Sequence, residues 1–262
     1  MDLPPEKAAY ARVPETADIE TSSDDYARRF RGPAGEWMLA VQEKIALDML
    51  ADMPGASVLD VGGGHGQIAI PLCRQGYAVT VLGSDESCRR RIDEIVRDGR
   101  CRFLTGNVIA LPFPDRAFDA AVSFRLLPHC AQWPSLIREL CRVARRCVVL
   151  DYPTTQGLNA VAPAFFGAKR RLEGNTRTWQ SFRHAEVSSA FAVQRFDVTR
   201  RTGQFFLPMA LHRMLHCRPA SAAMEGLCRS AGLTRLWGSP VIVRADRREA
   251  AAAPAGHPEG AR

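Results

Sequence analysis

The feature that most constrains the fold is a glycine-rich turn directly after a short apolar run. The run Ser57–Val61 has the length and the β-branched residues of a strand, and the residues Gly62-Gly63-Gly64-His65-Gly66 follow it. Glycines permit positive φ angles and let backbone N–H groups approach a ligand without a Cβ in the way. A strand that runs into such a turn, with a helix after it, predicts a ligand site at the end of a sheet.

Beyond this turn, short β-branched runs alternate with helical patterns, which is typical of parallel strands joined by crossover helices. We therefore predict a doubly wound α/β fold. The predicted strands are Ser57–Val61, Ala78–Leu82, Arg102–Leu104, Ala117–Ser123, Cys147–Asp151, Phe196–Arg201 and Pro240–Arg244. The predicted helices are Gly35–Met53, Gln67–Gln75, Glu86–Arg97, Pro134–Ala144 and Ala185–Gln194, with two short helices before the last strand.

The 262 residues suffice for one large α/β domain, which we place at residues 23–246. Residues 1–22 are polar and residues 247–262 are rich in Ala, Pro and Gly, so both ends are expected to be disordered. The N-terminus lacks the apolar core of a signal peptide, and no stretch approaches the roughly 18 apolar residues of a membrane span. These features predict a cytoplasmic protein without integral membrane segments. The eight cysteines form no CxxC pair and are interpreted as structural thiols.

The residue before the glycines indicates which ligand the turn binds. Gly64 to Ala69 fits the GxGxxA pattern of dinucleotide-binding proteins, and Asp85 lies about twenty residues further on, so an NAD(P)-dependent oxidoreductase is one interpretation. Asp60 argues against it, because a carboxylate at the end of the strand would repel a pyrophosphate. A ligand with a sulfonium and an ammonium group has no such conflict. Asp60 could instead cap its own turn.

The turn also belongs to a longer set of motifs. Its pattern D-x-G-x-G-x-G, together with Leu111-Pro112-Phe113-Pro114-Asp115 and the run Phe118–Ser123, resembles the class I S-adenosylmethionine-dependent methyltransferases. The likeness covers residues 24–151 and is closest to the broad group that contains the ubiquinone- and menaquinone-forming enzymes. It implies a mostly parallel, Rossmann-like sheet of seven strands with one antiparallel strand, and S-adenosylmethionine as the cofactor across the strand tips. The cofactor-binding residues that it implies are Asp60, Gly62, Gly64, Val108, Ser123 and Phe124, with Tyr26 and Arg29 closing over the methionine end.

Two positions depart from the family pattern. The acid that usually binds the ribose at the end of the second strand is replaced by Gly83, which leaves Ser84 or Asp85 to hold the ribose. Asp85 could equally cap the helix that follows it. Asn107 stands where the family generally has Asp, and its amide can still donate to and accept from the adenine edge. A protein that binds the cofactor without catalysis therefore remains an alternative.

Catalysis and acceptor binding are expected just beyond the strand ends. Methyl transfer depends mainly on positioning, and a general base is needed only if the nucleophile loses a proton. His129 is the candidate base, although a structural role is an alternative. Arg125 and Tyr152 are candidate contacts for a small-molecule acceptor, and Asp151 is expected to face the same site. His212 and His216 have metal-ligand spacing but no evident third ligand, so we predict no metal.

The segment from Tyr152 to Arg218 interrupts the α/β rhythm and is interpreted as an inserted lid, with acceptor-binding insertions at about 152–183 and 206–232. Between Lys169 and Arg218 the chain has ten basic and three acidic residues. The net charge of this segment, +7, equals that of the whole chain. Arg170 and Arg171 beside apolar groups suit an acceptor with an apolar body and an anionic group. Peripheral contact with anionic lipid, as in a lipid or quinone methyltransferase, and a solvated arginine face are the alternatives. No nucleic-acid-binding pattern is found.

Overall fold

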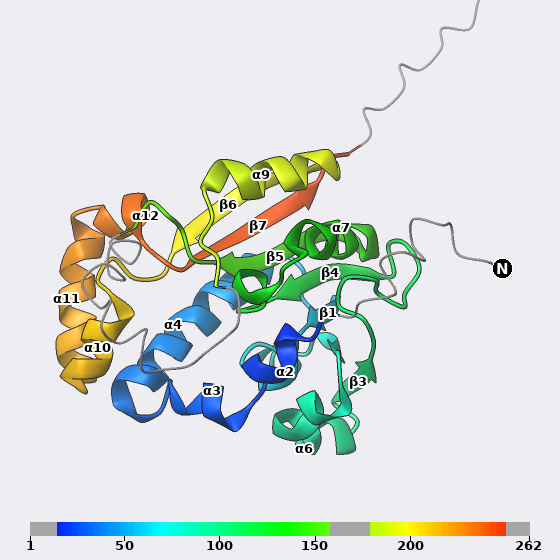
Figure 1. The fold of residues 1–262 in the computed structure, drawn as a ribbon, viewed down its shortest axis with the longest axis horizontal. Coiled ribbons are helices and arrows are strands. Elements are labelled where there is room, and N and C mark those ends of the chain that lie inside the picture. The colour runs from blue at the N-terminus through cyan, green and yellow to red at the C-terminus, as the bar shows by residue number, and fades with distance from the viewer. Residues whose placement is uncertain (1–14, 158–178, 250–262) are drawn as a thin grey trace, which may run out of the picture.

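The computed structural model describes residues 15–157 and 179–249, and these form a seven-stranded sheet with helices on both faces (Figure 1). The strand order is β3-β2-β1-β4-β5-β7-β6. All neighbouring strands are parallel except β7, which runs antiparallel to both β5 and β6. The strands are β1 Ser57–Val61, β2 Ala78–Gly83, β3 Cys101–Thr105, β4 Phe118–Ser123, β5 Ala144–Tyr152, β6 Phe196–Gly203 and β7 Val241–Arg247. The predicted fold class is confirmed.

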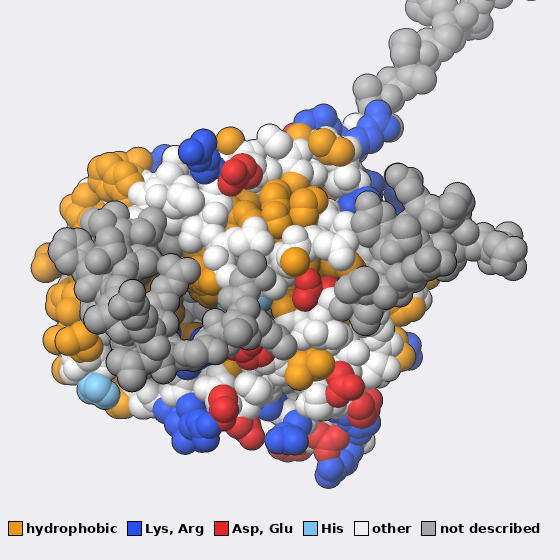
Figure 2. Space-filling model, viewed as in Figure 1, with side chains coloured by type: hydrophobic (Ala, Val, Ile, Leu, Met, Phe, Trp, Pro, Cys, Tyr) orange, Lys and Arg blue, Asp and Glu red, His pale blue; other side chains and the backbone are white. Residues whose placement is uncertain are grey.

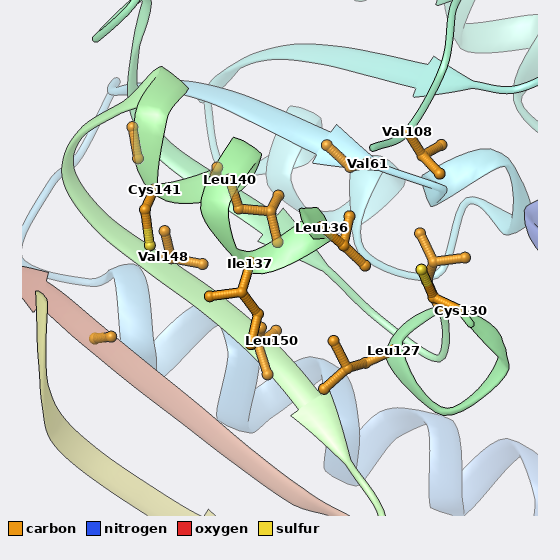
Figure 3. Packing of buried hydrophobic residues seen from close by; sticks show 14 of the residues in the cluster. Val61, Val108, Leu127, Cys130, Leu136, Ile137, Leu140, Cys141, Val148 and Leu150 are labelled. Carbon is orange, nitrogen blue, oxygen red and sulfur yellow. The ribbon is translucent and has the colours of Figure 1, made fainter. Parts of the chain in front are cut away.

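Successive residues of the central strands pack against different helical layers. In β5, Val148 and Leu150 belong to the hydrophobic cluster under α7 (Trp133–Val143) and α9 (His184–Val193), as Figure 3 shows for α7. Cys147 and Val149 belong to the opposite cluster, under α4 (Gly32–Leu50) and α5 (Ala69–Arg74). A strand covered on both faces reads as a nearly continuous apolar run, which explains why the sequence located these strands well.

Several elements differ from the prediction in detail. The helix expected at Glu86–Arg97 is a 3-10 segment, η2 (Glu86–Ile92), followed by α6 (Asp93–Arg97). Three helices precede β7 where two were expected: α10 (Met209–Leu215), α11 (Arg218–Ser230) and α12 (Leu233–Trp237). In the tail, β7 continues to Arg247, while residues 250–262 lie outside the described residues.

The expectation of disorder through residue 22 is wrong for its last part. Residues 17–21 form the short helix α2 (Ala17–Thr21), and α3 (Asp24–Arg28) follows directly. Asp18 and Ala17 are buried, because α2 packs against the loops at the strand ends instead of extending into solvent. Residues 1–14 and 158–178 lie outside the described residues, and the latter include most of the first predicted insertion.

Much of the surface charge in the described parts of the chain is paired locally. Acidic and basic side chains lie side by side along the edge formed by α3 and α6 (Figure 2), where Asp24 contacts Arg91 and Asp93 contacts Arg89. Exposed pairs of this kind contribute little to stability, about 0 to 1 kcal/mol each. Within the described ranges, no helix is long and apolar enough to cross a membrane.

Candidate active site

The glycine-rich turn is shaped around the side chain of Asp60. Gly62 adopts a left-handed conformation with a φ of 75°, which turns the chain at the end of β1. A Cβ on Gly63 would lie 2.1 Å from the carboxylate of Asp60, so this position accepts no side chain. The turn thus brings backbone and carboxylate together, as a ligand-binding turn requires.

Asp60 is 1% exposed, and neither of its carboxylate oxygens has a hydrogen-bond partner among the described residues. Burial is the main reason why the pKa of Asp60 is raised to about 7, and the nearby amide of Ala69 and the charge of Arg125 offset only part of that rise. A buried carboxylate without partners is costly. A cationic ligand at the turn would supply the missing partner, which agrees with the sulfonium and ammonium groups expected from the sequence.

The other predicted cofactor residues at the turn and at β4 have mainly structural partners. The Ser123 hydroxyl donates to the Val61 carbonyl at 3.0 Å and ties β4 to β1. Phe124 lines a small cavity of about 20 Å³ at the turn together with Asp60 and Gly62. His65 lies at the same cavity, and burial lowers its pKa to about 3, so it stays neutral and is a poor base. The role of each as a cofactor contact stays a prediction.

At the expected nucleoside end of the site, the positions that depart from the family pattern have partners within the chain. The carboxylate of Asp85 accepts the amide of Ser87 at 2.8 Å and caps η2, so the structure shows its capping role. The amide and the hydroxyl of Ser84 both donate to the carboxylate of Asp18 from α2. Asn107 accepts the amide of Ile109 through its Oδ1 at 3.1 Å, which leaves its side-chain nitrogen for another partner. Val108 is fully buried, and its packing on the adenine ring stays a prediction.

A larger cavity, of about 270 Å³, lies next to the turn, and Arg125 lines both. We call it the acceptor cavity. Its walls combine apolar side chains from four parts of the chain, Phe30, Met38, Trp179 and Phe205, with the guanidinium groups of Arg29, Arg125 and Arg213. A concave, mostly apolar space with few polar groups is typical of small-molecule sites.

Arg125 is fixed by a closed network of buried polar groups. Its Nε and Nη2 donate to Oε1 of Gln42 on α4, Gln42 donates to Oδ2 of Asp151, and Oδ1 of Asp151 accepts the backbone amide of Arg125 at 2.6 Å. This last bond holds Arg125 at a φ of 60°, a left-handed conformation that costs energy for any residue except glycine. Its Nη1 is buried and has no hydrogen-bond partner among the described residues. Burial raises the pKa of Asp151 to about 6.

Aromatic rings hold the three arginines of the acceptor cavity. The guanidinium carbons of Arg125 and Arg213 lie 4.6 Å and 5.6 Å from the centre of the Phe30 ring, and that of Arg29 lies 5.1 Å from the Tyr26 ring. Such contacts contribute about 0.5 to 2 kcal/mol each and leave the polar edge of a guanidinium able to bind an anion. Tyr26 and Arg29 line the acceptor cavity, and their role of closing over the methionine end stays a prediction.

The side of the cavity near Phe205 depends on a buried carboxylate. Glu225 of α11 accepts the amides of Phe206 and Leu207 and contacts Nε2 of His212 at 3.1 Å. His212 is thus used in a structural pair, and among the described residues no group of three potential metal ligands is found. His216, on the exposed side, contacts the carbonyl of Met214.

Other predicted acceptor contacts have different outcomes. The expectation for Tyr152 is wrong, because its ring packs inside the sheet core against Phe182 and its hydroxyl contacts Nδ1 of His184 at 2.8 Å. Asp151, one residue earlier, faces the cavity instead. His129 packs edge-on against Tyr26 and Trp179, and its role as a base stays a prediction. Arg170 and Arg171 lie outside the described residues.

Three functional candidates were missed in the sequence: Asp18, Gln42 and Arg213. Gln42 lies on the buried face of α4, between Met38 and Ile45. A polar residue at such a position is the signal that could have found it. Asp18 and Arg213 are ordinary polar residues in their local sequence. Only the fold brings them to the strand ends.

The buried carboxylate of Asp60 leads to a prediction about stability. Because its pKa is about 7 in the folded protein and about 3.9 in an unfolded chain, the folded state binds more protons between these values. The stability of the protein relative to the Asp60→Asn variant should therefore fall as the pH rises from 4 to 7, by about 2 to 4 kcal/mol, and stay constant above pH 8. Urea unfolding of both proteins across this range measures the difference. A difference that does not change with pH would show that Asp60 ionises normally.

Comparison with known proteins agrees with this fold and site. Residues 59–149 match the model of a family described as a methyltransferase domain. A demethylmenaquinone methyltransferase of Thermus thermophilus is 32% identical over 117 residues, which cover 41% of this chain and 52% of that protein. The chain thus matches about half the length of this relative.

Solved methyltransferases share the architecture at low sequence identity. The magnesium protoporphyrin IX methyltransferase of Synechocystis, solved with bound S-adenosylmethionine, aligns over 95% of this chain and 100% of its own. The TM-score is 0.59 and the sequence identity is 14%. A geranyl diphosphate methyltransferase aligns over 80% of this chain and 79% of its own, with a TM-score of 0.57 and 18% identity. The resemblance seen in the sequence is confirmed: residues 59–149 match a methyltransferase domain, and the chain has the fold of the class I methyltransferases.

Proposed function

We propose that this protein transfers a methyl group from S-adenosylmethionine to a small-molecule acceptor. The observation that carries the proposal is the position of Asp60, a buried carboxylate without a partner among the described residues, in a glycine-rich turn beside the acceptor cavity. The matched methyltransferase domain contains this turn. An NAD(P)-dependent oxidoreductase is disfavoured by the same carboxylate, because it would face a pyrophosphate.

Each part of the site has a defined role in this proposal. When bound, S-adenosylmethionine supplies a methyl carbon activated by a positively charged sulfur. Asp60 balances the positive charge of the methionine end, and Tyr26 and Arg29 cover that end. Ser84 and Asn107 provide hydrogen bonds, and Val108 an apolar surface, for the nucleoside. The contribution to rate is mainly positioning and exclusion of water, which a buried and mostly apolar site supplies.

We further propose that the acceptor has an apolar body and an anionic group. The acceptor cavity supports this, because Nη1 of Arg125 has no hydrogen-bond partner in the described parts of the chain, and Arg29 and Arg213 also line the mostly apolar walls. The geranyl diphosphate methyltransferase, whose structure contains that substrate, acts on a molecule of this kind. The proposal that Arg170 and Arg171 belong to the same acceptor site rests on the sequence alone.

Calorimetric titration with S-adenosylhomocysteine tests the cofactor assignment. We expect binding by the unaltered protein and at least tenfold weaker binding by Asp60→Ala, which loses the charge partner, and by Gly64→Val, whose side chain would collide with the carbonyl of Cys88. Asp119→Ala changes a carboxylate on the same sheet that pairs with Ser57 and Arg145, away from the turn, and serves as the control. Binding of NAD(H) with no binding of S-adenosylhomocysteine would replace this proposal with the oxidoreductase.

Methyl transfer to a panel of acceptors tests the anionic group. The panel contains prenyl diphosphates and aryl carboxylic acids, each with a neutral alcohol or ester of the same skeleton, and the readout is transfer of a radioactive methyl. We expect kcat/KM to be at least about tenfold higher for the anionic members, since a buried charge-assisted pair is worth about 1.5 to 3 kcal/mol. Arg125→Met should remove this preference, and Arg97→Met, an exposed change on α6, should keep it. A preference of the unaltered protein for the neutral members contradicts the assignment.

A peripheral-membrane methyltransferase acting on a lipid or quinone is a second candidate, and one observation favours it. Helix α11 buries Ser221 and Glu225 but exposes Leu227, whose side chain is 74% exposed. Leu236 and Trp237 of α12 and Met214 of α10 are exposed beside it, and hydrophobic side chains line this edge in Figure 2. Apolar side chains exposed together on a helix surface are typical of a protein or membrane interaction site.

The charge of this surface fits an anionic bilayer. Residues 209–237 contain four arginines and a single carboxylate, Glu225, which is buried. Basic residues near an anionic bilayer contribute about 1 kcal/mol each, and exposed apolar side chains add to this. Met209 and Arg213 of the same helices line the acceptor cavity, so a docked protein would open its cavity near the membrane surface.

Co-sedimentation with vesicles of phosphatidylglycerol and phosphatidylcholine tests this candidate. We expect the protein to bind these vesicles at low salt and to be released at high salt, because the basic residues are exposed. The double change Leu227→Asp and Leu236→Asp should weaken binding about tenfold or more, since it removes two inserted side chains and adds two repelled charges. Val193→Asp, an equally exposed position on α9, is the matched control. Absence of binding, or equal loss in the control, would leave only the candidate that acts in solution.

A further inference from the structure

Helix α2 occupies the end of the cleft where the nucleoside is expected. It lies beside the end of β1 (Figure 1), and its Asp18 is fully buried. The carboxylate of Asp18 accepts the backbone amide of Ser84 at 2.6 Å and also accepts the Ser84 hydroxyl. Ser84 directly follows Gly83, the last residue of β2, which stands at the position where the family has its ribose-binding acid. The chain's own carboxylate thus uses the donors predicted for the cofactor.

The neighbours of Asp18 fill the rest of this space. Ala17 is 3% exposed and belongs to the same hydrophobic cluster as Leu82 and Val108, the residue expected to pack on the adenine ring. Just before it, the carboxylate of Glu15 accepts the amides of Ala17 and Ala131. The segment that leads into α2 therefore packs into the same cluster as the expected adenine surface and binds the backbone amide of Ala131.

The other end of α2 reaches the glycine-rich turn. Thr21 lines the small cavity that contains Asp60 and Gly62, and the Ser22 hydroxyl lies so close to Gly64 that a Cβ there would be 2.8 Å from it. The space left at the turn is about 20 Å³. Ligand pockets usually measure about 300 to 1,000 Å³, so a nucleoside and α2 cannot occupy this end together.

We propose that α2 is an internal competitor of the cofactor, which must leave the cleft before S-adenosylmethionine binds. This inference rests on the proposed cofactor. In this proposal, Asp18 accepts the two hydrogen bonds that Ser84 would donate to the ribose. Ala17 takes the place of the adenine ring at Val108. The closed protein keeps its cleft filled and its buried donors satisfied when no cofactor is bound.

The local structure lets α2 leave without unfolding the domain. A helix of five residues is not stable alone, and the N-cap residue of α2, Thr16, makes no side-chain capping bond. The next helix, α3, is held separately, because Asp24 pairs with Arg91 and Tyr26 is buried at the acceptor cavity. Ser22 and Ser23 between them are the hinge. Since α2 stays tethered, only the open molecules bind the cofactor. The apparent affinity is therefore the affinity of the open form multiplied by the fraction of molecules that are open.

The first test compares two changes of Asp to Ala in the same segment. Asp18→Ala removes both acceptors of Ser84, whereas Asp25→Ala changes an exposed residue that pairs with Arg28 in its own helix. Titration with S-adenosylhomocysteine should show about tenfold tighter binding by Asp18→Ala, the equivalent of one or two hydrogen bonds, and no change for Asp25→Ala. In amide exchange, residues 15–22 of the unaltered protein should exchange faster when the ligand is added.

The second test locks α2 in place. The Asp18 carboxylate lies 3.5 Å from the thiol of Cys88, so Asp18→Cys places two thiols near each other for a disulfide. The oxidised variant should not bind S-adenosylhomocysteine, and reduction should restore binding to the level of Asp18→Ala. The unaltered protein, oxidised in the same way, controls for its other cysteines. Thermal unfolding of each variant verifies that the domain is folded.

Three results overturn the inference. The first is weaker binding of S-adenosylhomocysteine by Asp18→Ala, which would make Asp18 a ligand of the ribose. The second is slower amide exchange of residues 15–22 when the ligand is added. The third is normal ligand binding by the cross-linked protein. Failure of the cofactor proposal looks different, because then neither the unaltered protein nor Asp18→Ala binds S-adenosylhomocysteine at all.

Discussion

The position of the site is set by one constraint: a sheet that is buried on both faces can hold charged side chains only near the ends of its strands. Along β1, β4 and β5, side chains alternate between two hydrophobic clusters, so a carboxylate in the middle of these strands would have no partner. Asp60 and Asp151 lie near the carboxyl ends of β1 and β5, where loops and helix α4 supply polar groups. Burial raises the pKa of both, to about 7 and about 6. Asp151 holds the backbone amide of Arg125, and Asp60 lies at the small cavity of the glycine-rich turn.

The parts predicted from the sequence are those specified by local patterns. Continuous apolar runs located the strands, and the turn around Asp60 is specified by its glycines and the strand before it. Arg125 was found because it lies just beyond the end of β4, after Phe124. The error at Tyr152 came from a single position in a strand with alternating faces: Asp151 faces the site and Tyr152 faces the core.

What the sequence did not predict depends on contacts between distant segments. Residues 17–21 are too polar to read as a packed helix, and Asp18 is buried only because Ser84, 66 residues later, supplies its donors. Gln42 gains its role from Asp151, which is 109 residues away along the chain. Such pairings follow from the topology of the sheet, which brings the ends of β1, β2 and β5 to one edge, and local propensity contains no information about them.

The charges of the site are separated in a way that orients two reactants. The acid that would meet a cationic cofactor, Asp60, lies at the small cavity, whereas Arg29 and Arg213 line the acceptor cavity. Arg125 lines both and marks the boundary between them. A positive sulfur placed against Asp60 and an anionic group placed against the arginines would each be repelled from the other's side, since charge pairs are strong in a poorly hydrated site. In the proposed reaction, electrostatics would therefore set the direction in which the acceptor faces the methyl group, and the apolar walls between the charges would provide the space for transfer.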